Sequence, residues 1–110
     1  MWIFTETGFV SAVRHFSEKD KLVVRARDEK SLESLANYVG LEIISTPSND
    51  YPYRVLVADS LFATWLSKQT MAVDYPNFKN RVDQTRGHDF AVALMSVWNA
   101  MQQVTDIDTQ

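Results

Sequence analysis

The sequence has no cysteine and only three glycines and three prolines among its 110 residues. Without cysteine, disulfides, cysteine-ligated zinc, iron–sulfur clusters and thiol catalysis are excluded. So few glycines leave no Walker loop and no dinucleotide-binding glycine pattern, and the G-x-S-x-G motif of covalent hydrolases is also absent. The lack of cysteine fits a reducing compartment.

The sequence also lacks a long apolar run and a surplus of positive charge. Its apolar runs are far shorter than the roughly 20 residues of a membrane-spanning helix, and Met1–Thr5 has no basic signal segment. We therefore expect a cytoplasmic protein with no membrane partner. Lys and Arg number 11 against 14 Asp and Glu, for a formal charge of −3. This balance disfavours nucleic acid as a partner, because polyanions are bound largely through cation density.

Length and composition are those of one ordinary globular domain. Apolar residues make up 45% of the chain and charged residues 23%, and no glycine- or proline-rich linker divides it. A chain of this size is large enough for one hydrophobic core. We predict a single α+β domain over residues 1–104, followed by a loose C-terminal tail over residues 105–110.

Hydrophobic periodicity predicts a run of strands and helices. Alternating or β-branched stretches predict strands at Trp2–Thr5, Phe9–Arg14, Leu22–Arg27, Leu41–Ser45 and Tyr53–Ala58. Apolar residues at helical spacing predict a helix between the cap Asp28 and the stop residue Gly40, a helix from Asp59 or Ser60 to near Val73, a short helix capped by Asp74, and a final helix from Phe90.

This order predicts an α+β fold with an antiparallel or mixed sheet of about five strands and with helices packed on one face. The inner strand, helix, two strands and helix match most of a split β-α-β unit of the ferredoxin-like kind. The ferredoxin-like fold has one further strand at the end of the chain, and here we expect the N-terminal hairpin to supply it.

Arginines on the third predicted strand form the first candidate binding surface. Alternation places Leu22, Val24 and Ala26 toward the helices, and Arg25 and Arg27 on the opposite face. Arg14 of the neighbouring strand is expected to join them, with Trp2 or Tyr53 stacking nearby. Such a face can bind single-stranded bases. The alternative is that cross-strand Arg and Glu pairs simply solvate an open sheet face.

The tripeptide Asp-Tyr-Pro occurs twice, at Asp50–Pro52 and at Asp74–Pro76. Asp and Pro favour turns, because the Asp side chain hydrogen-bonds nearby backbone and Pro fixes φ. Both copies are therefore interpreted as boundaries between elements. The alternative is that polar residues around both copies converge on one pocket, and these are Tyr51, Tyr53, Arg54, Asp74, Tyr75, Asn77 and Lys79.

The two histidines give little support for catalysis. His88 precedes Asp89 just before the last predicted helix, which indicates a helix-cap region or, alternatively, a general base held by Asp89. His15 ends a strand and is expected at the surface. Two histidines without a metal-binding spacing predict no metal site, and we expect no cofactor.

Four ordered motifs cover nearly the whole chain: MWIFTETGFVSAV, VRARD, DYPYRV and DYPNFK. Together they resemble a family of small uncharacterised bacterial proteins that begin with Met-Trp and have a Gly-Phe hairpin. The resemblance implies an orphan gene, sometimes of the mobile-element type. It implies no activity, catalytic residue or ligand.

Three Trp, four Tyr and six Phe are many for a domain of this size. A small domain cannot enclose every large apolar side chain, so we predict a homodimer with Trp2, Phe4 and the helix of Trp98 as contributors.

Three functions are compatible with the sequence. The first is a non-enzymatic module that binds a small anionic ligand or a protein partner. Its predicted pocket is lined by Arg25, Arg27, Tyr53, Arg54, Tyr75, Asn77 and Lys79. The second is a cofactor-independent small dimeric enzyme of ferredoxin-like type, in which His88 or Asp74 supplies acid or base help. The third is binding of single-stranded nucleic acid by the basic sheet face.

Overall fold

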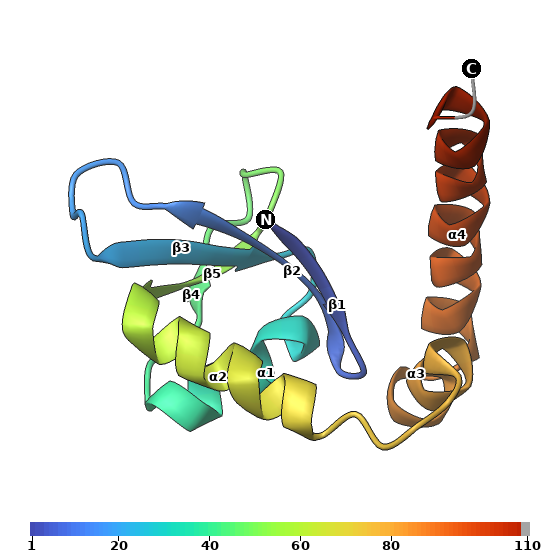
Figure 1. Cartoon of the computed structure of the whole chain (residues 1–110). Coiled ribbons are helices and arrows are strands. Elements are labelled where there is room, and N and C mark those ends of the chain that lie inside the picture. Colours follow the sequence, from blue (N-terminus) through green and yellow to red (C-terminus); the bar gives the residue numbers. More distant parts are fainter. Residues whose placement is uncertain (109–110) are drawn as a thin grey trace. The chain divides into compact units, whose positions relative to one another are not determined.

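The computed structural model describes residues 1–108 and confirms the predicted α+β class (Figure 1). The strands are β1 (Trp2–Thr5), β2 (Gly8–Arg14), β3 (Lys21–Ala26), β4 (Ile44–Ser45) and β5 (Tyr53–Ala58). The helices are α1 (Lys30–Val39), α2 (Asp59–Met71), α3 (Phe78–Arg86) and α4 (His88–Asp108).

Contacts divide the chain into two compact units, one over Met1–Asp74 and a second that begins at Tyr75. The first holds the sheet with α1 and α2, and the second holds α3 and α4. Composition does not signal this division, because the segment around Asp74 has no glycine- or serine-rich linker.

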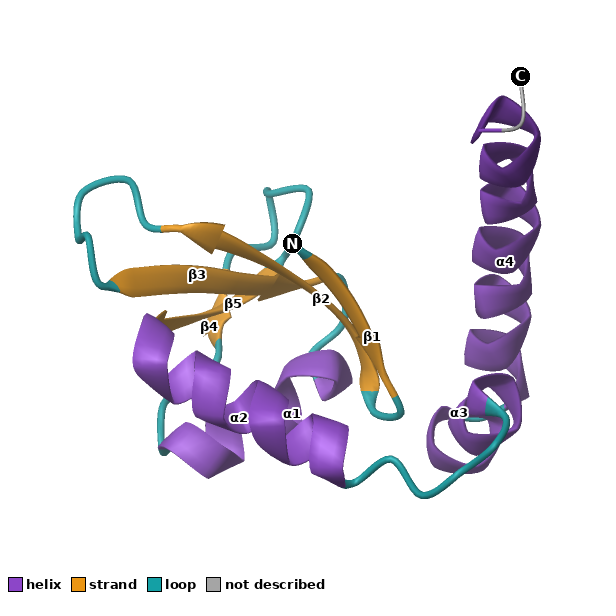
Figure 2. Ribbon diagram, viewed as in Figure 1, coloured by secondary structure: helices purple, strands orange, loops and turns teal. Residues whose placement is uncertain are grey.

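The sheet of the first unit has the order β1-β2-β3-β5-β4, and every neighbouring pair is antiparallel. Since β3 and β4 both run opposite to β5, they are parallel to each other with β5 between them. This is the arrangement of a split β-α-β unit, and β2 lies on the other side of β3. The wider ferredoxin-like assignment stays a prediction. Figure 2 shows α1 and α2 on one face of the sheet.

The face of the sheet that meets these helices forms the hydrophobic core. Val24 and Ala26 of β3 are completely buried, and Leu22 packs against them, as the alternation of β3 predicts. Trp65 of α2 is 1% exposed, and its indole N–H donates to Ser34 Oγ over 3.1 Å. The other buried members of the core are Val10, Ala12, Leu32, Leu35, Ala36, Val55, Val57 and Phe62.

Helix α1 ends where the sequence predicts. Gly40 takes the left-handed conformation with φ of 69°, and its N–H donates to the Ala36 carbonyl over 2.9 Å. A glycine tolerates this conformation without the steric cost that a Cβ brings. The short strand β4 follows this stop and lies at the sheet edge. Only Ile44–Ser45 of the predicted strand Leu41–Ser45 pairs with β5.

Arg14 does not join the arginines of the open sheet face, which corrects one expectation. It is the register partner of Leu22 and therefore lies on the helix-covered side of the sheet. There its guanidinium donates to Asp59 Oδ2 over 2.7 Å at the start of α2. This hydrogen bond holds the pKa of the Asp59 carboxyl below its ordinary value of 3.8.

The lowered pKa of Asp59 predicts a pH-dependent contribution to stability. A carboxyl with a depressed folded-state pKa stabilises the fold above its unfolded value of 3.8, and this contribution disappears as the pH falls through the folded-state value. Asp59→Asn should therefore be less stable than the wild type at neutral pH and should match it in strong acid. Urea unfolding at several pH values measures this. Arg14→Met should show the same profile, and a difference that persists in strong acid would contradict the assignment.

The second unit is a pair of helices in which α3 packs on α4, with Val82 and Ala91 buried. Asn77 caps α3, because its Oδ1 accepts from the Asn80 N–H over 3.0 Å. The sequence predicts this cap at Asp74, but Pro76 fixes the chain before the helix and leaves the cap position to Asn77.

Helix α4 continues to Asp108, and the predicted loose tail over residues 105–110 stays a prediction. No glycine or proline lies between Val104 and Asp108 to stop the helix. Residues 109–110 of that tail lie outside the described residues. No helix within residues 1–108 has both the length and the apolar character needed to cross a membrane.

Candidate anion-binding site

Two arginines lie directly opposite each other on the helix-free face of the sheet. Arg25 of β3 and Arg54 of β5 are register partners, and on its other side Arg25 is paired with Ser11 of β2. Both arginines are half-buried. Like charges directly opposite each other on neighbouring strands destabilise a sheet. The pair therefore carries a cost that the fold alone does not explain.

The guanidinium of Arg25 is held in place from two sides. It donates to Ser11 Oγ over 3.0 Å, and Ser11 is itself buried. Its central carbon lies 4.5 Å from the ring centre of Tyr51, which is 9% exposed. A guanidinium stacked on an aromatic face keeps its N–H groups free to point sideways toward an anion. Arg25 is thus a fixed donor, positioned before any ligand arrives.

Arg27 shares the same aromatic ring but has its own counter-ion. Its guanidinium carbon lies 4.9 Å from the Tyr51 ring centre, and its Nη1 lies 3.2 Å from Asp50 Oδ1. Both side chains of this ion pair are well exposed. Arg27 therefore supports Tyr51 and the loop, and its charge is already compensated.

Arg25 and Arg54 have no such compensation. Among the side chains of residues 1–105, no carboxylate lies within ion-pair distance of either arginine. The Nε atoms of both are buried and have no hydrogen-bond acceptor in the described part of the chain. A partly buried cation without a counter-ion is costly, and an anion at the terminal nitrogens would offset the cost of the uncompensated charge.

An open pocket of about 540 Å³ lies over this pair. Its lining residues are Arg25, Ser48, Asn49, Asp50, Tyr51 and Arg54. The loop that forms its wall is closed by the Thr46 N–H, which donates to the Pro52 carbonyl over 2.7 Å. The first Asp-Tyr-Pro copy therefore serves both interpretations. It ends a turn before β5, and it supplies Tyr51 beneath the arginines and Asp50 beside Arg27.

Tyr53, a predicted site residue, lies on the other face of the sheet. It is the register partner of Ala26 and packs against the hydrophobic core. Successive side chains of a strand point to opposite faces, so Arg54 and Tyr53 cannot share a surface. The aromatic residue of the site is instead Tyr51, which precedes the strand. Because neighbouring residues of a strand point to opposite faces, the sequence alone could have excluded Tyr53 from a site that contains Arg54.

The second Asp-Tyr-Pro copy has its contacts within the second unit. The ring of Tyr75 lies 6.1 Å from that of Phe78 and 4.9 Å from the guanidinium carbon of Arg81. Asn77 caps α3, and together with Lys79 it lines a pocket of about 440 Å³. The other lining residues of this pocket are Pro76, Phe78, Leu94, Met95 and Trp98. Tyr75 and Asn77 thus have structural roles in the helix pair.

The two candidate catalytic residues lie on the surface. The His88 side chain is 79% exposed, and its Nδ1 lies 3.5 Å from Asp83 Oδ2. The predicted partner Asp89 is not the one that contacts it, because consecutive residues of α4 point in different directions. Asp74 is exposed at the end of the first unit. Neither residue lines either of the two pockets.

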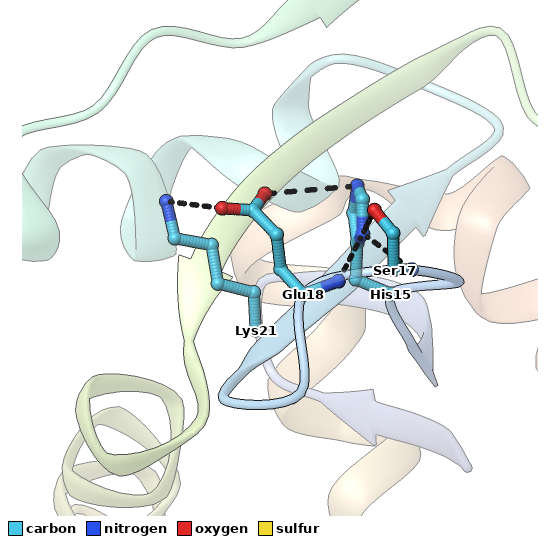
Figure 3. A network of polar contacts seen from close by, with 4 residues as sticks. All are labelled: His15, Ser17, Glu18 and Lys21. Carbon is cyan, nitrogen blue, oxygen red and sulfur yellow. Dashed lines mark hydrogen bonds and ion pairs between the residues drawn. The ribbon is translucent and has the colours of Figure 1, made fainter.

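His15, expected to be a simple surface residue, organises the loop between β2 and β3 (Figure 3). Its Nδ1 accepts from the backbone N–H of Ser17 over 3.2 Å and of Glu18 over 3.1 Å. The Glu18 carboxylate lies 3.9 Å from both His15 Nε2 and Lys21 Nζ. Because Nδ1 must be an acceptor here, His15 has a structural role that its sequence position did not reveal.

The fold and the site define an α+β protein with a cationic pocket on the open face of an antiparallel sheet. Comparison with protein-family models, with curated proteins and with solved structures found no significant match to this chain. The resemblance to an uncharacterised bacterial family, and through it to mobile elements, stays a prediction.

Proposed function

We propose that the protein is a non-enzymatic cytoplasmic module that binds a small anionic ligand between Arg25 and Arg54. The observation that carries this proposal is the cross-strand arginine pair itself. The two guanidinium groups are half-buried and have no carboxylate partner within the described residues, and one of them is fixed over a buried tyrosine. An anion bridging the pair replaces like-charge repulsion with two charge-assisted interactions.

The chemistry of the donors favours an oxyanion. A guanidinium offers several N–H groups in a planar fork that matches carboxylate and phosphate oxygens. Arg25 has one terminal nitrogen engaged with Ser11, which leaves the other available to a ligand. Ser48 and Asn49 add hydroxyl and amide groups to the pocket wall. The pocket opens to solvent, so a ligand can enter without movement of the sheet.

Thermal unfolding in the presence of simple anions tests the proposal. Phosphate, malonate and citrate at constant ionic strength should each be compared with chloride. A bound anion at about 100 times its dissociation constant should add about 2.7 kcal/mol to the free energy of unfolding. Arg14→Met is the matched control, because Arg14 is already paired with Asp59 on the other face. Absence of stabilisation by all three anions would contradict the proposal.

The second unit supports the predicted homodimer. Helix α4 exposes large apolar side chains at helical spacing, and these are Val97, Trp98, Met101 and Val104. We propose that α4 pairs with α4 of a second copy.

Met101→Glu should convert the dimer into a monomer. Met101 is 57% exposed in the middle of this stripe, and a carboxylate there would be buried without a partner in the pair. Light scattering at tens of micromolar measures the mass, and Met71→Glu is the matched control, since Met71 is exposed in the first unit. A wild-type protein that is monomeric at this concentration excludes the homodimer.

A further inference from the structure

The open face of the sheet carries an aromatic platform in line with the arginine pair. Register partners in an antiparallel sheet lie on the same face. Trp2 pairs with Ser11, Ser11 with Arg25, and Arg25 with Arg54. These four residues therefore form one row across β1, β2, β3 and β5, with an indole at one end and two guanidinium groups at the other.

Trp2 is exposed but not loose. Its side chain is 71% exposed, and its ring meets Phe9 edge to face with centres 5.8 Å apart. Phe9 in turn stacks on Phe4 at 4.6 Å. Phe9 contacts the indole from the same face of the hairpin and is itself backed by Phe4, and most of the indole surface stays open. An exposed and fixed indole is a stacking platform for a flat ring.

The spacing of the row specifies an elongated ligand. Trp2 and Arg25 are two strands apart, or roughly 9.6 Å at about 4.8 Å per strand, with Ser11 between them. Ser11 is buried, and its Oγ accepts from Arg25 over 3.0 Å, so the Arg25 guanidinium reaches from β3 toward β2 and shortens the gap to Trp2. A ligand that reaches both ends has a flat ring over β1 and an anionic group over β3 and β5.

The charge of the row favours a phosphate over a carboxylate. Two guanidinium groups without counter-ions are balanced by about two negative charges, and a phosphate monoester carries about −1.5 to −2 at neutral pH. No acidic residue belongs to the row, and Asp50 at the pocket wall is paired with Arg27. A flat ring joined to a phosphate is the chemistry of a nucleotide.

We infer that the anionic ligand is a nucleotide unit whose phosphate binds Arg25 and Arg54 and whose base stacks on Trp2. This inference rests on the proposed anion site and adds the base platform to it. The unit is either a free nucleotide or one residue of a single strand. The overall charge of −3 favours the free nucleotide, because a strand needs further cationic contacts.

Calorimetric titration of the full chain with three probes tests the inference. Adenosine 5′-monophosphate should bind at least tenfold more tightly than inorganic phosphate, because a stacked base adds to the phosphate contact. Adenosine alone should bind weakly. Trp2→Ala should reduce the affinity for the nucleotide to that for phosphate and leave phosphate binding unchanged, and Trp2→Phe should be intermediate. Trp98→Ala, in the second unit, should have no effect on either probe.

The outcomes separate the base platform at Trp2 from the anion site at Arg25 and Arg54. If phosphate binds but the nucleotide binds no better, or if Trp2→Ala leaves the nucleotide affinity unchanged, the base platform is excluded and the anion site stands. If neither probe binds, both proposals fail. A single-stranded oligoadenylate of about ten nucleotides distinguishes the source of the ligand. Binding at least tenfold tighter than the mononucleotide assigns the site to a strand, and equal or weaker binding assigns it to the free nucleotide.

Discussion

Trp65→Ala is expected to lower the free energy of unfolding by about 3–5 kcal/mol, which is the usual cost of removing a buried aromatic side chain. Trp65 is 1% exposed, and its ring lies 5.6 Å from that of Phe62, between α2 and the rest of the core. The substitution leaves a cavity in this layer and removes the partner of Ser34. Trp65 is the largest of the fully buried side chains, so its truncation should cost more than that of its neighbours in the core. Urea unfolding followed by circular dichroism measures the loss.

Two control variants separate the packing of Trp65 from its hydrogen bond. Trp65→Phe keeps most of the ring but cannot donate to Ser34 Oγ, so it should cost less than Trp65→Ala. Trp2→Ala removes an indole that is 71% exposed and should cost less than about 1 kcal/mol. If Trp65→Ala were as mild as Trp2→Ala, the helix-covered face would not be the core.

Arg54→Met should weaken anion binding without destabilising the free protein. Methionine keeps an apolar stem of similar length, and the substitution relieves the repulsion between register partners Arg25 and Arg54. The free protein should therefore be as stable as the wild type or more stable. Affinity for phosphate should fall about 10- to 100-fold, since a hydrogen bond to a charged group is worth about 1.5–3 kcal/mol. Unfolding with and without phosphate measures both effects.

These two effects of Arg54→Met have opposite signs, and this distinguishes a binding site from a structural ion pair. If Arg54 had a structural role, its replacement would destabilise the free protein. Lys79→Met is the control, because Lys79 is exposed in the second unit and should change neither quantity by much. Clear destabilisation of Arg54→Met in the absence of anions would mean that Arg54 serves the fold rather than a ligand.

The alternation of β3 was predictable because Leu22, Val24 and Ala26 fix which face meets the helices. The helix-stop residue Gly40 was predictable for a similar local reason, since its left-handed conformation needs no distant partner. Arg54 could be proposed from its neighbourhood in the sequence. The position of Arg54 opposite Arg25 could not be predicted, because the register between β3 and β5 depends on a long connection that holds α1 and β4.

The two residues that were misassigned to the open sheet face differ in cause. The face of Arg14 follows from the register of β2 with β3, which no local pattern specifies, whereas alternation within β5 already separates Tyr53 from Arg54. Tyr51 lies just before β5, outside the strand pattern, so only the folded loop shows that its ring supports Arg25 and Arg27. The division into two units was likewise invisible, because the segment near Asp74 has ordinary composition.

The repeated Asp-Tyr-Pro has a different use at each position. Around Pro52 it closes a turn and places Tyr51 under two guanidinium groups. Around Pro76 it leads into the cap residue Asn77 of α3, and Tyr75 packs with Phe78 and Arg81. The same turn chemistry serves both, and only the first copy belongs to the proposed anion site.

The most direct measurement is a calorimetric phosphate titration of the wild type and of the double variant Arg25→Lys with Arg54→Lys. The double variant keeps both positive charges on the sheet face but loses the planar forks and the stacking of Arg25 on Tyr51. We expect it to bind phosphate at least tenfold more weakly than the wild type. Equal affinity in the two proteins would show that the charge of the sheet face, rather than a built arginine site, attracts the anion.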